Sequence, residues 1–160
     1  MMRTINFRHN VEQTRFVIFP GETPNMSVLV TVLESMGIEW DIAYYHCNPV
    51  VLQESCSLTK STHPLIVTKT CQPIKGDDLF TQSADEFFAE KDTGITHQRQ
   101  KPVKLYVKLL NLFVQDKTLY VVDACGGSGS CALACQELCV KCLVLDRSAI
   151  KVRLIQQRAK

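Results

Sequence analysis

A glycine-rich bend between two apolar segments constrains the fold of this chain more than any other feature of its sequence. The segment TLYVVDA leads into the bend, CGGSGS, which is followed by CALACQELC and by a second apolar segment, KCLVLD. Neither apolar segment alternates with polar residues, so we predict two strands that are covered on both faces, as in a parallel α/β sheet. Residues 119–147 should therefore form a strand, a tight turn, a helix and a second strand.

The bend lies where an open α/β sheet binds ligands, at the carboxyl end of a strand. Gly127 and Gly129 allow a ligand to approach the backbone closely, and amides at the start of the following helix can donate hydrogen bonds to it. Asp146 ends the next strand, about 20 residues further on, where a carboxylate can accept both hydroxyl protons of a ribose. Together they predict a nucleoside-sized site, although the bend alone suits a tight turn and Asp146 alone suits a helix cap.

Two other glycine motifs fit this bend poorly. A phosphate-binding P-loop would need Gly-Lys-Ser or Gly-Lys-Thr after the bend, and the chain has none there. The nicotinamide fingerprint needs the spacing G-x-G-x-x-G, whereas Gly127 and Gly129 are followed by Cys131 and Ala132. The sequence therefore disfavours both a P-loop and a nicotinamide-dinucleotide site at this bend.

The rest of the chain supplies the other elements of a single α/β domain. Strands are predicted over 15–19, 39–47 and 65–70, and helices over 27–36, after Pro102 and over 148–160. In the first helix Val28, Val32 and Met36 form an apolar stripe that Leu29 and Leu33 widen; this stripe should be buried, and Gly37 should end the helix. Residues 75–100 are largely acidic and polar, and are predicted to be flexible.

The two later helices carry apolar stripes of their own. After Pro102 the stripe consists of Val103, Val107, Leu110 and Val114, with Leu109 and Phe113 beside it. In the basic helix at the end of the chain, Ile150, Leu154 and Ile155 should face inward. Each helix should therefore pack one face against the sheet.

Charge and hydropathy exclude few partners. The formal net charge of +2 is too small to identify a nucleic-acid-binding protein by itself. The chain has no apolar run approaching the roughly 18 residues of a membrane span, and its first residues, MMRTINFRHN, lack the apolar middle of a secretion signal. We therefore expect a soluble, intracellular protein with no membrane partner.

The cysteines do not predict a disulfide framework or a metal site. Of eight cysteines, five crowd into one apolar segment: Cys125, Cys131, Cys135, Cys139 and Cys142. We interpret them as reduced thiols that pack like small apolar residues. Structural zinc sites usually take paired ligands from two separated loops, so the spacing Cys139-x-x-Cys142 is weak support for zinc. A cysteine–histidine nucleophile is compatible with the composition, but no feature of the sequence favours it.

Three stretches resemble the DNA amino-methyltransferases, which modify adenine N6 or cytosine N4. They are HQRQKPVKLYVKLL at 97–110, VVDACGGSGSCALA at 121–134 and CLVLD at 142–146. The family commonly has His-Pro-Thr-Gln-Lys-Pro, then Asp-Pro-Phe-x-Gly-Ser-Gly-Thr, then an acidic residue after the second strand. The matching residues are His97, Gln100, Lys101, Pro102, Asp123, Gly127, Ser128, Gly129 and Asp146, whereas Ala124 and Cys125 replace the Pro-Phe pair.

The resemblance implies a Rossmann-like methyltransferase fold of the α/β class with S-adenosylmethionine as cofactor. Asp123 and the backbone of Gly127–Gly129 would flank the methionine part, Asp146 would hold the ribose, and Lys101-Pro102 would border the same pocket. The cofactor site implied in this way consists of Asp123, Cys125, Gly127, Ser128, Gly129, Asp146, Lys101 and Pro102. DNA would be the substrate, and the motif order is the permuted order of one branch of the family.

The resemblance also divides the domain into parts. Residues 11–74 would hold the late strands and hairpin, 75–100 a flexible segment, and 101–160 the half that binds the cofactor. The family's catalytic quartet, Asp/Asn/Ser-Pro-Pro-aromatic, holds the target amine and stacks on a flipped base. The chain contains no Pro-Pro pair, and Asn48-Pro49-Val50-Val51 lacks the second proline and the ring. We assign no catalytic residue and expect an incomplete fold. The resemblance implies a DNA methyltransferase that is a fragment or one piece of a split enzyme, with a second chain supplying the missing motif. The alternative is an inactive remnant or partner subunit of a methyltransferase complex.

Overall fold

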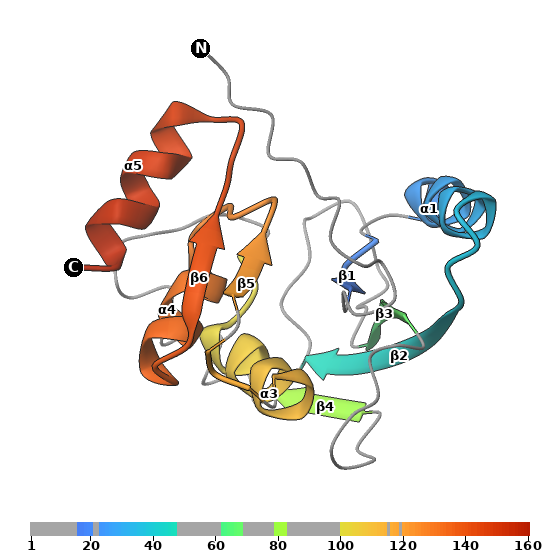
Figure 1. Cartoon of the computed structure of the whole chain (residues 1–160), viewed down its shortest axis with the longest axis horizontal. Coiled ribbons are helices and arrows are strands. Elements are labelled where there is room, and N and C mark those ends of the chain that lie inside the picture. The colour runs from blue at the N-terminus through green and yellow to red at the C-terminus, as the bar shows by residue number, and fades with distance from the viewer. Residues whose placement is uncertain are drawn as a thin grey trace, which may run out of the picture.

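The computed structural model of the chain describes residues 16–20, 23–47, 62–68, 79–82, 100–114, 116–118 and 120–160. Along the chain the elements are β1 (Val17–Ile18), α1 (Thr23–Ser35), β2 (Trp40–Cys47), β3 (Thr62–Thr68), β4 (Leu79–Gln82), α3 (Val103–Phe113), β5 (Tyr120–Asp123), α4 (Ser130–Glu137), β6 (Lys141–Val144) and α5 (Ala149–Arg158). Figure 1 shows β5, β6, α4 and α5 on one side of the molecule and β1 to β4 with α1 on the other. The predicted α/β class is confirmed.

Four strands from the first half of the chain form one sheet in the order β1-β3-β2-β4. β3 runs antiparallel to both of its neighbours, so that Val67 lies opposite Val17 on one side and Asp41 on the other. β4 runs parallel to β2 and falls inside the segment 75–100, which the sequence predicted to be flexible. The backbone of residues 79–82 pairs with β2, so this part of the segment is a strand. The flexibility of the segment stays a prediction, and residues 75–78 and 83–99 lie outside the described part of the chain.

The second sheet contains the glycine bend. β5 and β6 pair in parallel, with Val121 opposite Cys142 and Asp123 opposite Val144. α4 connects them and packs against β6, so the predicted strand, turn, helix and parallel strand are confirmed. Among the described residues these two strands form a sheet separate from the other four.

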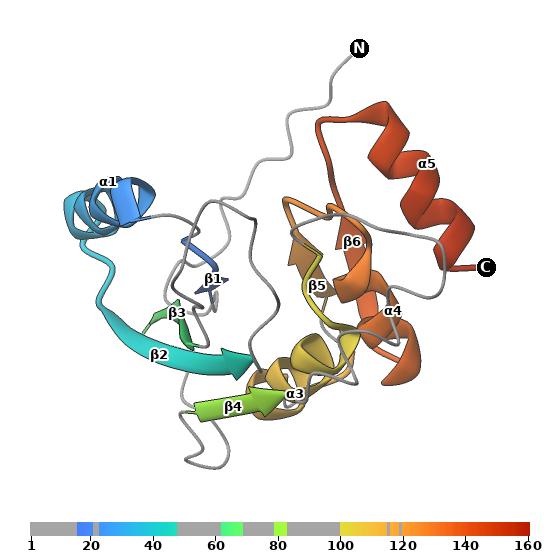
Figure 2. The same ribbon diagram turned by 180° about the vertical axis from the view of Figure 1, so that it is seen from behind.

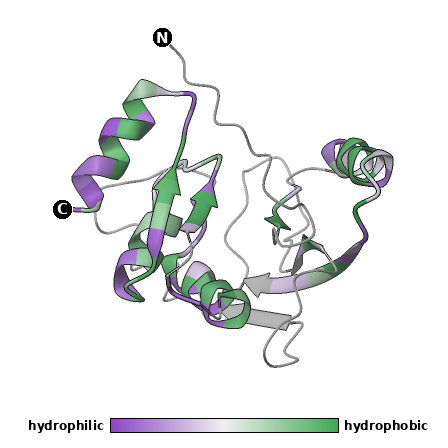
Figure 3. Cartoon of the chain, viewed as in Figure 1, coloured by the Kyte–Doolittle hydropathy of each residue, from purple (hydrophilic) through white to green (hydrophobic). Residues whose placement is uncertain are grey.

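α3 joins the two sheets because it has an apolar face for each of them. Leu105 and Leu109 are buried against Tyr45, Leu65 and Val67 of the four-stranded sheet. On another side of the helix, the predicted stripe packs against α4 and β5, with Leu110 at its centre and Val103, Val107 and Val114 around it. Figures 1 and 2 show α3 next to both sheets from either side, and Figure 3 shows its apolar residues around the helix.

The buried stripe predicted for α1 is wrong at Val28, Val32 and Met36 and correct at Leu33. Val28, Val32 and Met36 are 65%, 46% and 60% exposed, whereas Leu33 is only 5% exposed. The helix begins at Thr23, earlier than predicted. It lies beside the four-stranded sheet, on the side away from β5 and β6 (Figure 1). It therefore buries a narrow face centred on Leu33, and Gly37, with φ +67°, turns the chain back after it.

The prediction that β5 and β6 are covered on both faces is also wrong for the described residues. Val121 and Cys142 pack against the core beneath α4, but the next residues along each strand point the other way. The exposed apolar side chains are Tyr120, Val122, Leu143 and Leu145, at 68%, 43%, 39% and 39%. We call these four side chains the open face of β5–β6. Apart from Lys141 and Asp123 the strand residues are apolar, yet α3 and α4 pack on only one side of them.

α5 packs through its second half. Ile155 is 9% exposed, but Ile150 is 79% exposed, so the predicted inward stripe of Ile150, Leu154 and Ile155 is correct only near the end of the helix. Ile155 lies against the glycine bend, where its Cδ1 would be 2.9 Å from a Cβ atom on Gly126. Within the part of the chain that the structure describes, no helix combines the length and apolar character needed to cross a membrane.

Candidate functional site

The glycine bend between β5 and α4 is a tight turn with two residues of positive φ. Gly127 and Gly129 have φ values of +54° and +86°, which residues other than glycine rarely adopt. The amide of Gly129 donates to the carbonyl oxygen of Gly126 at 2.7 Å, which closes the turn. Gly129 is also the N-cap of α4, and no side chain caps the helix there. The first amides of α4 therefore point out of the helix without a partner inside it.

Position 126 has no room for a side chain, because Val144 of β6 and Ile155 of α5 lie directly against it. A Cβ atom at this position would overlap Cγ1 of Val144 and would lie 2.9 Å from Cδ1 of Ile155. The amide of Gly126 donates to the carbonyl oxygen of Leu145 at 2.8 Å, and the amide of Leu145 donates to that of Asp123 at 2.8 Å. These bonds extend the pairing of β5 and β6 beyond the strands, and they hold the bend against the end of β6.

Asp146 lies at the bend, as the sequence predicted. Its Oδ2 accepts a hydrogen bond from the amide of Gly127 at 2.9 Å, and its Oδ1 accepts one from the amide of Ser148 at 2.8 Å. The bond from Ser148 holds the pKa of Asp146 below its usual range, with further contributions from Gly127, Lys151 and Arg147. The group is thus a carboxylate at neutral pH, and each oxygen retains a lone pair for a hydroxyl proton.

Asp123, at the end of β5, is the second acidic group of the site. Burial raises its pKa, while a hydrogen bond from the amide of Cys125 at 3.0 Å and the charge of Lys101 lower it. The negative charge of Asp146 also raises the pKa of Asp123, so the two carboxylates repel each other across the bend. The side chain of Cys125 is exposed beside them.

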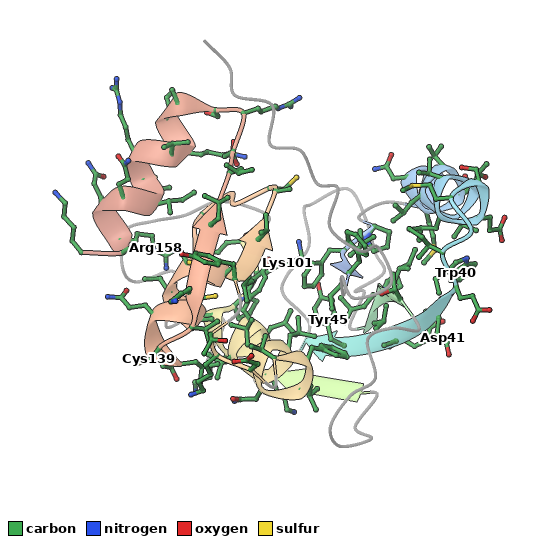
Figure 4. The ribbon with its side chains drawn as sticks, viewed as in Figure 1. Trp40, Asp41, Tyr45, Lys101, Cys139 and Arg158 are labelled. Carbon is green, nitrogen blue, oxygen red and sulfur yellow. The ribbon has the colours of Figure 1, made fainter. Side chains whose placement is uncertain are left out.

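Lys101 connects this site to the other sheet. Its Nζ lies 4.6 Å from the centre of the ring of Phe19, which follows β1. That ring lies 5.6 Å from the ring of Tyr106 and 5.9 Å from that of Tyr45, so three aromatic side chains meet beside the lysine. Pro102 is buried as the N-cap of α3, and Figure 4 shows Lys101 between the two sheets. The charge of Lys101 lowers the pKa of Asp123, so the two residues interact electrostatically.

Three residues near the site were missed by the sequence analysis. Phe19 was assigned to a strand, but the position of that strand's end beside Lys101 was not foreseen. Tyr106 belongs to the helix after Pro102, and the presence of Asp123 helps to raise its pKa, after the larger effect of burial. Arg158 donates a hydrogen bond to the carbonyl oxygen of Ser128 at 2.7 Å. A basic residue near the end of a helix carries no sequence signal for such a contact.

The cysteines behind the bend form a packed thiol cluster. Cys131 and Cys135 are buried, and hydrogen bonds link Cys135 to both Cys131 and Cys142. The bond with Cys135, together with burial, raises the pKa of Cys131. Among the described residues, no three histidine, cysteine, aspartate or glutamate side chains are placed to bind a metal ion.

Solved structures of DNA methyltransferases have this arrangement of elements. No protein-family model and no curated protein sequence matches the chain. M1.HpyAVI in complex with S-adenosylmethionine superposes with a TM-score of 0.69 at 19% identity, over 92% of this chain and 74% of that one. The chain has the fold of these enzymes.

Two further solved structures are similar to this chain. The cytosine-N4-specific PvuII DNA methyltransferase gives a TM-score of 0.66 at 16% identity, over 92% of this chain and 64% of that one. TTHA0409 of Thermus thermophilus, complexed with S-adenosyl-L-methionine, gives 0.59 at 13% identity, over 92% and 68%. The predicted Rossmann-like methyltransferase fold is confirmed; the permuted motif order stays a prediction.

Proposed function

We propose that this chain binds S-adenosylmethionine at the glycine bend and acts in methyl transfer to DNA, at adenine N6 or cytosine N4. The observation that carries the proposal is the contact between Asp146 and Gly127, because it places a charged carboxylate directly beside the bend. The structures of M1.HpyAVI and TTHA0409 with S-adenosylmethionine support the choice of cofactor, since the chain shares their fold.

Each residue of the site would contact a different part of the cofactor. Asp146 would accept hydrogen bonds from the ribose hydroxyls, which it can do while it bonds Gly127 and Ser148. The backbone of Gly127, Ser128 and Gly129 and the first amides of α4 would face the methionine part. Asp123, with Cys125 exposed next to it, would attract the methionine ammonium group, and Lys101 and Pro102 would form the border towards β1.

S-adenosylmethionine supplies a methyl group on a sulfonium, which transfers when a nucleophilic nitrogen lies in line with it. The contribution of these residues is to hold the cofactor in a fixed orientation, which can account for much of the rate of such a reaction. The nitrogen would be the exocyclic amine of a DNA base. No described residue is assigned to hold that amine.

Isothermal titration calorimetry with S-adenosylmethionine tests the proposal. We expect heat of binding for the wild-type chain and affinity reduced roughly 10- to 100-fold for Asp146→Ala, because hydrogen bonds to a charged group contribute about 1.5–3 kcal/mol. The variant Asp41→Ala is a matched control, since Asp41 is an exposed aspartate at the other sheet. Absence of heat for the wild type would reject cofactor binding.

A second candidate function is that of a non-catalytic partner in a methyltransferase complex. The open face of β5–β6 favours it, because Tyr120, Val122, Leu143 and Leu145 present apolar side chains where a Rossmann-like sheet normally carries helices. A strand and helix of a second polypeptide, bringing the missing catalytic motif, would cover that face. Transfer of a labelled methyl group to DNA by the purified chain alone, as a monomer, would refute this candidate.

A further inference from the structure

We propose that Arg158 is a positioning residue that orients the glycine bend for the methionine part of the cofactor. The inference rests on the proposed function. Arg158 ends α5, and its Nη1 donates to the carbonyl oxygen of Ser128 at 2.7 Å, across 30 positions of the sequence. The bond is partly buried and comes from a charged group, so it is stronger than a bond between two neutral groups.

The bond fixes one peptide plane inside the bend. The carbonyl of Ser128 and the amide of Gly129 belong to the same planar peptide unit, so they point in opposite directions. Arg158 binds the oxygen, while the amide donates to the carbonyl oxygen of Gly126 at 2.7 Å. Both ends of this unit are therefore fixed immediately before α4 begins at Ser130. The direction of the first amides of α4 follows from the orientation of this unit.

Ile155 supports the same part of the bend from the same helix. A Cβ atom on Gly129 would lie 3.1 Å from Cγ1 of Ile155, and one on Gly126 would lie 2.9 Å from Cδ1 of Ile155. Ile155 and Arg158 are three positions apart, so they share one face of α5. Figure 4 shows Arg158 at the end of α5 next to the second sheet. This face of α5 therefore covers one side of the bend.

Asp146 fastens the beginning of α5 to the same bend. Its carboxylate bonds the amide of Ser148, the N-cap of the helix, and the amide of Gly127. The helix is thus bound to the bend at its start through Asp146 and at its end through Arg158. Asp146 would face the ribose, whereas Arg158 acts on the peptide unit that precedes the methionine-binding amides. The two residues should therefore affect different parts of the ligand.

Calorimetry with S-adenosylmethionine and ligand-detected NMR with adenosine, which lacks the methionine part, separate these roles. For Arg158→Met we expect affinity for S-adenosylmethionine to fall about tenfold, as for loss of one charged hydrogen bond, with affinity for adenosine unchanged. Arg158→Lys should recover part of the loss. Arg153→Met, an exposed residue of the same helix, is the control and should bind as the wild type does.

Each outcome decides a separate question. Equal binding of S-adenosylmethionine by Arg158→Met and the wild type would overturn the inference, and so would an equal loss for both ligands, which indicates a general structural role. A wild-type chain that binds neither ligand would instead reject the proposed function. Thermal melting without ligand shows whether Arg158→Met folds; if it does not, Arg158→Lys must show the selective loss of S-adenosylmethionine affinity.

Discussion

The carboxylate of Asp146 and the amide of Gly127 are hydrogen-bonded at 2.9 Å although they lie 19 positions apart in the sequence. One belongs to the end of β6 and the other to the bend after β5, and parallel pairing brings these two strand ends to the same edge. Had the residues faced opposite sides of the molecule, they could not both belong to the proposed cofactor site. Their contact makes the site open to direct tests.

The stability of the chain in acid should depend on Asp146. Its pKa is lowered in the folded state, chiefly by the hydrogen bond from Ser148, so its stabilising contribution is present above the pKa of an unfolded aspartate. That contribution disappears as the pH falls through the lowered folded pKa. Urea unfolding at about pH 6 and about pH 3 should therefore show a smaller loss of stability for Asp146→Asn than for the wild type.

Asp123 should change the pH dependence of stability in the opposite direction from Asp146. Burial raises its pKa in the folded state, so protonation favours folding and the charged form opposes it. Asp123→Asn should remove a penalty that appears as the pH rises through the raised folded pKa. Its loss of stability between about pH 6 and about pH 3 should exceed that of the wild type. The same direction of change for both variants would contradict the assignment of these environments.

Cys125 should report occupancy of the site. Its thiol is exposed beside Asp123, whereas Cys139 is exposed at the far end of α4. S-adenosylmethionine should slow alkylation of Cys125 by iodoacetamide and leave the rate at Cys139 unchanged, because only the first thiol borders the proposed pocket. Peptide mass mapping of the alkylated protein measures both rates in one sample. Equal protection of the two thiols would indicate a global change instead of local binding.

Alanine at Gly129 should be more harmful than alanine at Gly37. Both glycines have positive φ, +86° and +67°, and a side chain in that region costs about 1–2 kcal/mol. A Cβ atom at Gly129 would also press on Ile155 at 3.1 Å, which adds ~1–3 kcal/mol of overpacking, whereas nothing lies within 4 Å of one at Gly37. Chemical denaturation measures the difference, and only Gly129→Ala should also lose cofactor affinity.

Leu105 should be one of the most sensitive positions of the core. It is 0% exposed, between α3 and the four-stranded sheet, so Leu105→Ala should lower the free energy of unfolding by ~2–5 kcal/mol. Val28→Ala on α1 should change it by less than about 0.5 kcal/mol, because Val28 is 65% exposed. Similar losses for both variants would mean that α3 does not close this core.

The second half of the chain was predictable because its signals are local. The bend, its flanking strands and the position of Asp146 follow from neighbouring residues and from the rule that parallel strands end at one edge. The helix after Pro102 was also foreseen, together with the stripe around Leu110. Leu109 and Phe113 were placed beside that stripe, but the second apolar face to which they belong with Leu105 was not foreseen, because one stripe was expected and a helix that contacts two sheets has two.

The errors have a common origin in tertiary context. Val28 and Ile150 follow helical spacing, but spacing identifies an apolar face and not the element that covers it. The apolar run in β5 and β6 predicted two covered faces, yet Tyr120 and Leu143 are exposed. The contact of Arg158 with Ser128 depends on the length and direction of α5, and no local pattern encodes these.

The position of α3 between two cores also bears on how the protein assembles during synthesis. β1 to β4 leave the ribosome before Leu105 and Leu109, so the apolar face around Leu65 stays uncovered until α3 follows. α3 in turn presents Leu110 to α4, which is made later still. The core of the four-stranded sheet therefore includes residues from the second half of the chain. Neither core can form completely until α3 has been synthesised.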